Sequence, residues 1–285
     1  MLMFFLELMG VILLILILVM IIDGNRFVIR EYTINNDKIK KDYNFILLSD
    51  LHNKQYGKDN YRLIQKIKQL NPDGIIVAGD MLTAKPGCEF DIPLTLLHQL
   101  TVKYPVYYGI GNHEYRIKIY KDNYGRAYDN YISQLKKMGV VVLENDAITL
   151  QDNNIRIQGV MIDRKYYKRF RNTKMNDAYL PQLLGKTDSS KMQIYIAHNP
   201  DYFKEYAYSG ADLVLSGHLH GGVMRLPLLG GIVSPKCTLF PKYDGGLFKE
   251  KKSSMIVSRG LGMHTIPIRI FNPGELIMVH LKSCK

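Results

Sequence analysis

Histidine, aspartate and asparagine residues stand at the ends of several apolar runs in this 285-residue chain. These positions are Asp50, His52, Asp80, Asn112, His113, His198, His218 and His220. In an extended chain, residues i and i+2 project to the same side, so Asp50 and His52 could face one ion. The last two histidines repeat that spacing. Imidazole nitrogens with carboxylate and amide oxygens suit Mn, Fe or Zn, and suit Cu(I) or an iron–sulfur cluster poorly.

The size of this set indicates two ions. Even seven of these eight groups are too many for one tetrahedral ion, whereas two ions that share a carboxylate account for seven. Two ions about 3.5–4 Å apart could clamp an in-line displacement in which a bridging hydroxide is the nucleophile. Glycines in "LVLSGHLHGG", residues 213–222, would let backbone turns approach the ions closely. Taken singly, a strand-end aspartate commonly forms a turn and a buried histidine commonly packs in a core.

The same residues follow strands that the sequence predicts to be buried. The stretches "FILLSDLH", "GIIVAGD" and "PVYYGIGNHE" are apolar runs that end in polar groups, which is typical of buried parallel strands. Helices predicted around residues 60–71 and 92–100 separate them. This strand–helix–strand repeat predicts an α/β fold whose site lies outside the carboxyl ends of the strands.

Beyond residue 140 the chain favours strands with short connections. They are predicted in "VVVLEND", "AITLQ", "IRIQGVMI", "MQIYIAHNP", "DLVLSGHLHGG", "SMIVSRG" and "LIMVHL". Helices are expected near "YDNYISQLKKM" and "DYFKEYAYSG". Because no internal repeat or low-complexity linker follows residue 40, we expect one catalytic domain over residues 44–285. A juxtamembrane segment and first strand over residues 25–43 would precede it.

The amino terminus has the composition of a membrane span. Its first 22 residues are apolar except for Glu7, and about 20 apolar residues suffice to cross a hydrocarbon core as a helix. A cleaved secretory signal would carry a basic start and a small-residue cleavage site, yet no Lys or Arg precedes Arg26. We therefore expect residues 1–24 to be a retained anchor in the cell membrane. Downstream basic residues favour a cytoplasmic domain, but long domains override that bias and the side stays open.

The net charge of the chain restricts the possible classes of binding partner only in part. The chain has 38 basic and 26 acidic residues, a formal net charge of +12. This balance suits an anionic membrane surface, a phosphate-bearing substrate or nucleic acid, and an ordinary solvated surface can have it too. Three widely spaced cysteines form neither a disulfide framework nor a zinc-ribbon pattern. Structural or surface roles are expected for the remaining histidines, His98, His264 and His280.

The ordered motifs "D-x-H", "GD", "GNHE", "H" and "GHxH" resemble those of the calcineurin-like metallophosphoesterases, and more narrowly of their membrane-anchored bacterial branch. The resemblance runs from about residue 26 to the carboxyl terminus and includes the closing stretches "SRGLG" and "PIRIFNPGEL". It implies a hydrolase of phosphoester or phosphoanhydride bonds. It also implies an α/β sandwich of two mixed β-sheets flanked by helices, after one transmembrane helix.

The resemblance also implies two sets of metal ligands. The residues that would bind the first ion are Asp50, His52 and His220. The residues that would bind the second ion are Asn112, His198 and His218. Asp80 would bridge the two ions.

Two further positions follow from the same resemblance. His113 would not be a ligand but would assist the transition state by protonating the leaving oxygen, a role that a histidine can fill near neutral pH. The family often has a second acidic residue in "GD-x-x-D", where this chain has Thr83. A hydrogen bond between this position and a metal ligand would therefore differ from that in the family, and the metal affinity would differ as a result.

We expect a membrane-anchored, dinuclear metal phosphoesterase that hydrolyses a phosphate ester or a pyrophosphate. The anchor and the basic surface favour an anionic substrate at the bilayer, such as a lipid-linked one, and the tyrosine-rich residues 163–170 could face it. A nuclease or cyclic-nucleotide phosphodiesterase is the alternative; nucleic acid is less favoured because the anchor tethers the site to a membrane. A non-catalytic scaffold would be expected to have lost ligands, and no obligate protein partner is indicated.

Overall fold

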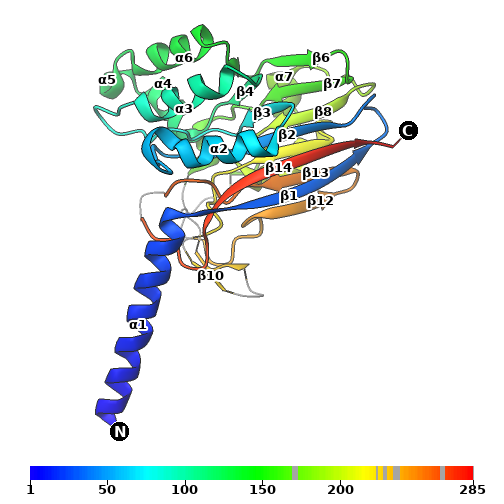
Figure 1. Cartoon of the computed structure of the whole chain (residues 1–285). Coiled ribbons are helices and arrows are strands. Elements are labelled where there is room, and N and C mark those ends of the chain that lie inside the picture. Colours follow the sequence, from blue (N-terminus) through cyan, green and yellow to red (C-terminus); the bar gives the residue numbers. More distant parts are fainter. Residues whose placement is uncertain (169–172, 223, 227–229, 234–237, 264–266, 285) are drawn as a thin grey trace.

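Two six-stranded β-sheets lie face to face, and helices cover the outer face of each (Figure 1). The computed structural model describes residues 1–168, 173–222, 224–226, 230–233, 238–263 and 267–284. His264 and residues 169–170 of the tyrosine-rich stretch lie outside these ranges.

The first sheet contains the strands that precede four of the seven predicted ligands, Asp50, His52, Asp80 and Asn112. In spatial order its strands are β1 (Phe27–Asn36), β14 (Gly274–Ser283), β2 (Tyr43–Leu48), β3 (Gly74–Val77), β4 (Val106–Gly109) and β5 (Val141–Leu143). Strands β2 to β5 run parallel. β14 runs antiparallel to β2, and β1 runs parallel to β14.

The second sheet carries the remaining histidines. In spatial order its strands are β12 (Gly246–Glu250), β13 (Ser253–Val257), β9 (Leu213–Ser216), β8 (Met192–Ile196), β7 (Ile155–Gly159) and β6 (Ala147–Leu150). The four central strands are parallel and the two edge strands are antiparallel to their neighbours. A short pair, β10 (Arg225–Leu226) and β11 (Gly230–Gly231), stands apart. The predicted α/β fold with two mixed sheets is confirmed.

Apolar side chains from both sheets fill the space between them. Fully buried examples are Phe45, Leu47, Ile76, Ile157, Ile194, Leu213 and Ile277. Because these strands present large apolar groups to the interior, burial of their surface holds the sheets together. This core supports the strand ends from which the site residues project.

Helices form two further apolar layers. The helices are α1 (Leu2–Asn25), α2 (Tyr61–Leu70), α3 (Asp91–Thr101), α4 (Asn112–Ile119), α5 (Lys121–Tyr124), α6 (Ala127–Lys137), α7 (Tyr179–Leu184) and α8 (Phe203–Tyr208). Helices α2, α3, α4 and α6 pack on the first sheet, and α7 and α8 pack on the second. α4 was not expected from the sequence, because "NHEYRIKI" lacks a continuous apolar face. The Glu114 carboxylate accepts the Gly111 N–H at 3.1 Å and so satisfies a donor at its start.

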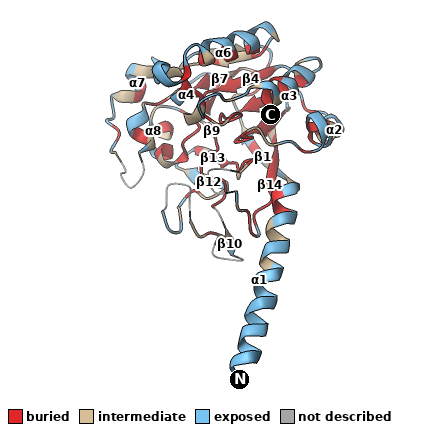
Figure 2. Cartoon of the chain, turned by 90° about the vertical axis from the view of Figure 1, so that its left-hand side faces the viewer, coloured by how far each residue is buried: buried red, intermediate tan, exposed pale blue. Residues whose placement is uncertain are grey.

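The end of α1 and the carboxyl ends of β2, β3 and β4 lie at the same edge of the molecule. Since β14 is antiparallel to β2, it begins where β2 ends. β1 is parallel to β14, so it also begins there, directly after α1. Within the described residues, α1 is the one helix long and apolar enough to cross a membrane, and its apolar window is not buried against the domain (Figure 2).

Gly109, at the end of β4, lets the two sheets approach closely. A Cβ there would lie 2.3 Å from Cγ2 and 2.9 Å from Cβ of Ile196, across the sandwich. We expect Gly109→Ala to lower the free energy of unfolding by about 1–3 kcal/mol, because the sheets must shift to admit a methyl group. In Gly109→Ala/Ile196→Ala the new methyl fills part of the cavity, so the loss should be smaller than the sum of the single losses. Urea denaturation of the three variants measures this; additive losses would contradict the contact.

Candidate metal centre

All seven predicted ligands come together at the carboxyl edge of the two sheets. Their positions are after β2 (Asp50, His52), after β3 (Asp80), at the start of α4 (Asn112), after β8 (His198) and after β9 (His218, His220). Two triads within this set have ligand atoms that all lie within 4.8 Å of one another. One is Asp50, His52 and His220, and the other is Asp80, His198 and His218.

In the first triad two imidazole nitrogens face one another. His52 Nε2 lies 3.2 Å from His220 Nε2, and His220 Nε2 lies 3.3 Å from Asp50 Oδ1. The Thr83 hydroxyl lies 3.3 Å from the other ring nitrogen of His52, Nδ1. Thr83 therefore contacts the back of the His52 ring. A cation among these three inward-facing atoms would relieve the close approach of two imidazole nitrogens.

In the second group the tautomer of His198 can be assigned from its neighbours. His198 Nδ1 lies 2.6 Å from the Ala78 carbonyl oxygen, which only accepts hydrogen bonds, so Nδ1 carries the proton. Nε2 of the neutral ring then directs a lone pair at Asp80 Oδ2 and Asn112 Oδ1, each 3.1 Å away. Three acceptors that converge in a buried place require a proton or a cation between them.

Asp80 lies between the two groups. Its Oδ2 is 3.1 Å from His198 Nε2 and 3.9 Å from His52 Nε2. Its Oδ1 accepts the backbone N–H of His113 at 2.8 Å, which fixes the carboxylate plane. One oxygen of Asp80 thus faces ligands of both groups, as a shared carboxylate would.

The site attracts positive charge. Burial lowers the pKa of His198, yet the carboxylates of Asp80 and Asp50 outweigh burial and raise that pKa to about 9. Burial raises the pKa of Asp50 to about 6, and the charge of Asp80 acts in the same direction. Burial also raises the pKa of Asp80, but the imidazoles of His198, His113 and His52 lower it well below its usual value. The donor set and its charge both fit divalent cations.

The backbone reaches this arrangement through left-handed conformations. Five of the seven predicted ligands have positive φ, and these are Asp50 (51°), His52 (47°), Asp80 (54°), His218 (74°) and His220 (51°). The expectation that an extended i, i+2 geometry aims each pair at one ion is therefore wrong in its mechanism, although the residues do converge. Such conformations cost about 1–3 kcal/mol each and are held by their surroundings. Asp50 and His52, for example, donate their backbone N–H groups to carbonyls of the β3 loop at 3.0 and 3.1 Å.

Glycines make room for the carboxylates. A Cβ at Gly217 would lie 2.2 Å from Asp50 Oδ2, and one at Gly111 would lie 2.2 Å from Asp80 Oδ1. A Cβ at Gly221 would lie 2.5 Å from Asn272 Oδ1. Gly217 and Gly221 of "SGHLHGG" therefore leave room for side chains that form or orient the site. From the sequence, these glycines were expected to let the backbone approach the ions instead.

His113 differs from the predicted ligands. Its Nδ1 accepts the Ala84 backbone N–H at 2.8 Å, so in the neutral ring the proton is on Nε2. That Nε2 lies 3.9 Å from Asp80 Oδ2, and its ring packs edge-on against His52 with centroids 4.8 Å apart. With its proton on Nε2, the neutral ring can donate a hydrogen bond there. His113 also forms a third group with His52 and Asp80, in which ligand atoms lie within 4.8 Å of one another.

Sequence reasoning missed two residues that shape the site, Glu114 and Asn272, whereas Tyr167 lies in the tyrosine-rich stretch that was expected to face the substrate. Buried Glu114 accepts the backbone N–H groups of Asp80 and Met81 at 2.9 Å, and its place in "GNHE" was the one available signal. The Asn272 side chain donates to the His220 and Gly222 carbonyls at 2.7 and 2.6 Å, a contact across about fifty residues that no local pattern reveals. The Tyr167 ring lies 5.3 Å from that of His218, so the described part of the tyrosine-rich stretch does reach the site.

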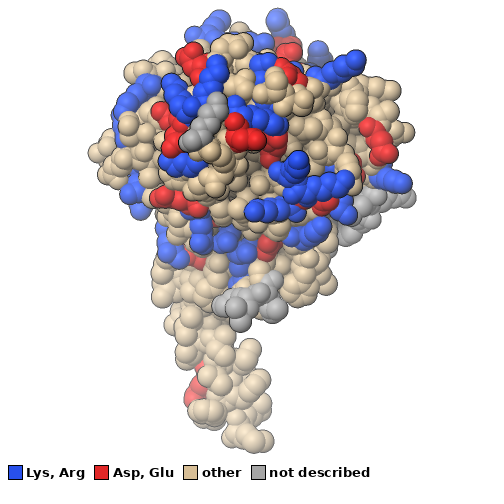
Figure 3. All heavy atoms as spheres, turned by 90° about the vertical axis from the view of Figure 1, so that its right-hand side faces the viewer, with Lys and Arg blue, Asp and Glu red and all other residues tan. Residues whose placement is uncertain are grey.

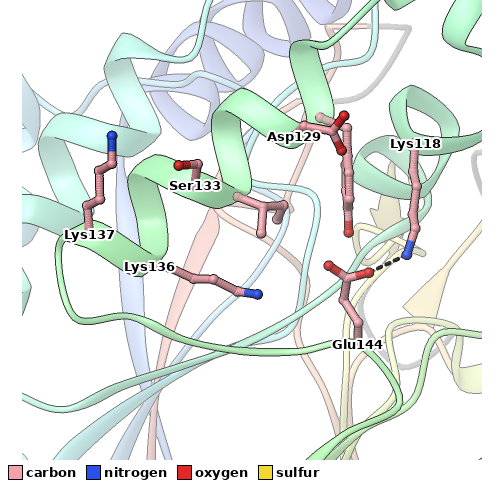
Figure 4. Close-up of a pocket in the computed structure, with 8 residues that line it drawn as sticks. Lys118, Asp129, Ser133, Lys136, Lys137 and Glu144 are labelled. Carbon is pink, nitrogen blue, oxygen red and sulfur yellow. Dashed lines mark hydrogen bonds and ion pairs between the residues drawn. The ribbon is translucent and has the colours of Figure 1, made fainter.

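A separate surface pocket of about 660 Å³ lies between α4, α6 and the end of β5 (Figure 4). Its walls include Lys118, Lys136, Lys137 and Glu144, and Lys118 pairs with Glu144. None of the predicted ligands lines it.

Comparison with known proteins yields relatives of the same kind. The chain is 31% identical over 261 residues to an uncharacterized metallophosphoesterase of Helicobacter pylori, covering 89% of this chain and 63% of that protein. It is 26% identical over 262 residues to an uncharacterized metallophosphoesterase of Campylobacter jejuni, covering 90% of this chain and 64% of the relative. The chain thus spans less than two thirds of the length of these two relatives. Phosphodiesterase YaeI of Escherichia coli is 25% identical over 224 residues, with coverage of 77% of this chain and 75% of that protein.

The match to a family description covers the site itself. Residues 43–222 match the calcineurin-like phosphoesterases, and this range contains β2, β3, β4, β8 and β9 together with all seven predicted ligands. The match extends over more than half of the chain, and the clustered Asp and His residues are those that a metal-dependent member would need. The chain belongs to the calcineurin-like phosphoesterase family.

Proposed function

We propose that this chain is a membrane-anchored phosphoesterase that binds two divalent cations, Mn, Fe or Zn, and hydrolyses a phosphodiester or a pyrophosphate. The observation that carries the proposal is the position of Asp80 Oδ2, which faces His198 at 3.1 Å and His52 at 3.9 Å. One ion would be held by Asp50, His52 and His220. The other would be held by Asn112, His198 and His218, with Asp80 shared.

The chain's own groups would position the substrate and stabilise the leaving oxygen. When bound, the cations would polarise a phosphoryl oxygen and lower the pKa of a water so that it becomes a nucleophile near neutral pH. His113 would direct its Nε2–H at the leaving oxygen and stabilise the developing charge by a hydrogen bond, because the Ala84 N–H holds the other ring nitrogen without a proton. Tyr167, against His218, would cover one side of the site and exclude water.

The substrate class is proposed from three features. The family acts on phosphoester bonds, and one relative is named a phosphodiesterase. Basic side chains are spread over the domain, including its surface next to α1 (Figure 3), which suits a substrate with several negative charges. α1 would tether the site to a membrane, where a lipid-linked phosphate is the substrate within reach. A nuclease activity would instead require nucleic acid to reach the membrane surface.

Asp80→Asn should reduce phosphodiester turnover by more than about a hundredfold. Mutation of a residue that only hydrogen-bonds to a metal ligand typically lowers activity about 10–100-fold, and loss of the ligand itself should cost more. Bound metal, measured by mass spectrometry, should fall at both positions. Asp188→Asn, on a half-exposed carboxylate away from the site, serves as the matched control and should turn over like the wild type. Wild-type turnover in Asp80→Asn would contradict the shared carboxylate.

His113→Ala should keep both metal ions, because its backbone N–H to Asp80 remains. Turnover of an alkyl phosphodiester should fall by about 10²–10³, since the leaving oxygen then loses the hydrogen bond that stabilises its developing charge. A nitrophenyl ester, whose leaving group needs little stabilisation, should be affected much less. If bound metal falls in parallel with turnover, His113 is a ligand and the proposed role fails.

Removal of residues 1–22 should give a soluble protein with turnover near that of the full chain, because Asp23 and Gly24 are buried against the domain and remain. Removal of residues 1–24 should in addition lower Tm by about 2–4 °C, since Asp23 Oδ2 accepts the Asn272 backbone N–H at 2.9 Å. Sedimentation with membranes and thermal melts compare the two. A chain without residues 1–22 that still sediments with membranes would contradict a single anchor.

A further inference from the structure

The helix α1 joins the domain without a flexible linker. Asp23 and Gly24 are buried, and Asp23 accepts the backbone N–H of Asn272 at 2.9 Å. Lys54 Nζ donates to the Asn25 side chain at 3.0 Å, and the Arg26 guanidinium pairs with Asp23 at 2.8 Å. These contacts orient the helix relative to the sheets, so α1 and the domain move together.

The length of α1 places the membrane next to the domain surface. Its apolar part, residues 2–22, spans about 31 Å at about 1.5 Å per residue. That length equals the thickness of a hydrocarbon core, about 30 Å, so nothing is left over to lift the domain away. The metal centre lies at the same edge, because Asn272 joins the α1 contact to the His220 and Gly222 carbonyls at 2.7 and 2.6 Å.

Two neighbouring segments at this edge expose large apolar side chains. They are Leu226, Leu239, Phe240 and Phe271, which are 38%, 65%, 58% and 48% exposed. The segments are joined, since Arg225 N–H donates to the Ile270 carbonyl at 3.0 Å and Phe240 N–H donates to the Ile232 carbonyl at 2.8 Å. β10 lies on the same side of the sheets as α1 in both ribbon views (Figures 1 and 2). We call these four side chains the apolar rim.

Two rim residues are held in an unfavourable backbone conformation. Phe240 has φ 47° and Phe271 has φ 53°, values that bulky side chains rarely adopt. About half of each side chain stays exposed. Backbone strain of this kind clusters at functional sites such as ligand clamps.

We propose that the apolar rim rests in the interfacial layer of the lipid bilayer beside α1 and holds the metal centre against the headgroups. The proposal rests on the proposed function in one respect, that α1 spans the membrane. A bilayer is the occupant that fits, because α1 already brings it to the rim and because aromatic side chains favour the boundary between lipid and water. Lys54 and Arg26, at the end of α1, would face anionic headgroups.

The absence of tryptophan from the sequence gives a direct test. Phe240→Trp introduces a single tryptophan, whose emission can be excited apart from that of the 20 tyrosines, into the rim of the full chain, reconstituted in vesicles of phosphatidylcholine and phosphatidylglycerol. Val102→Trp is the matched control, since Val102 is 80% exposed at the end of α3, on the side of the sheets away from α1. We expect the rim variant to show blue-shifted emission and stronger quenching by brominated acyl chains than the control variant, because only the rim would lie at the boundary between lipid and water.

Two results would overturn the proposal. One is emission and quenching of the rim variant that equal those of the control variant. The other is a blue shift that grows with the ratio of protein to lipid while brominated lipid leaves it unquenched, which would mean that a second copy covers the rim. Neither readout depends on metal or turnover, so failure of the phosphoesterase activity would be seen separately, as loss of phosphodiester hydrolysis by the unaltered chain.

Discussion

Two buried carboxylates, Asp50 and Asp80, share a small volume with the imidazoles of His52, His198, His218 and His220, and this volume requires positive charge. Carboxylates removed from water are costly unless they are paired with cations or strong donors. A proton on His198 partly meets the need, which is why the neighbouring carboxylates raise its pKa to about 9 despite burial. Divalent cations meet it fully, and the rest of the fold is arranged so that these groups cannot separate.

The sandwich supplies that restraint. Parallel strands of both sheets end at one edge, so two independent sheets contribute ligands to one centre, and the apolar core between them fixes their separation. Left-handed backbone conformations then turn the ligands inward, and Gly111 and Gly217 leave space for the carboxylates they face. Buried Glu114 ties the β3 loop to the start of α4. The fold tolerates the backbone strain of the positive-φ ligands because the buried strands that precede them hold these segments in place.

The sequence predicted the strands well because buried parallel strands have continuous apolar runs. The seven predicted ligands follow these strands directly, and their metal-binding roles stay predictions. β2, β3, β4, β8 and β9 all occur where such runs were found. The geometry of Asp50 and His52 was not predictable from spacing, since positive φ replaces the extended conformation assumed for them. Asn272 was missed because its contact with His220 depends on the path of the chain after β13. The buried Asp23 likewise carries no signal in a stretch that composition describes simply as apolar.

Hydrolysis by this chain would depend on two ions held at the edge of the sandwich. The most direct measurement is metal content per chain of the purified full-length protein, by inductively coupled plasma mass spectrometry, alongside phosphodiester turnover before and after chelation. We expect about two divalent cations per chain, loss of turnover on their removal and recovery when Mn, Fe or Zn is returned. One ion per chain, or turnover that survives complete chelation, would contradict the dinuclear centre.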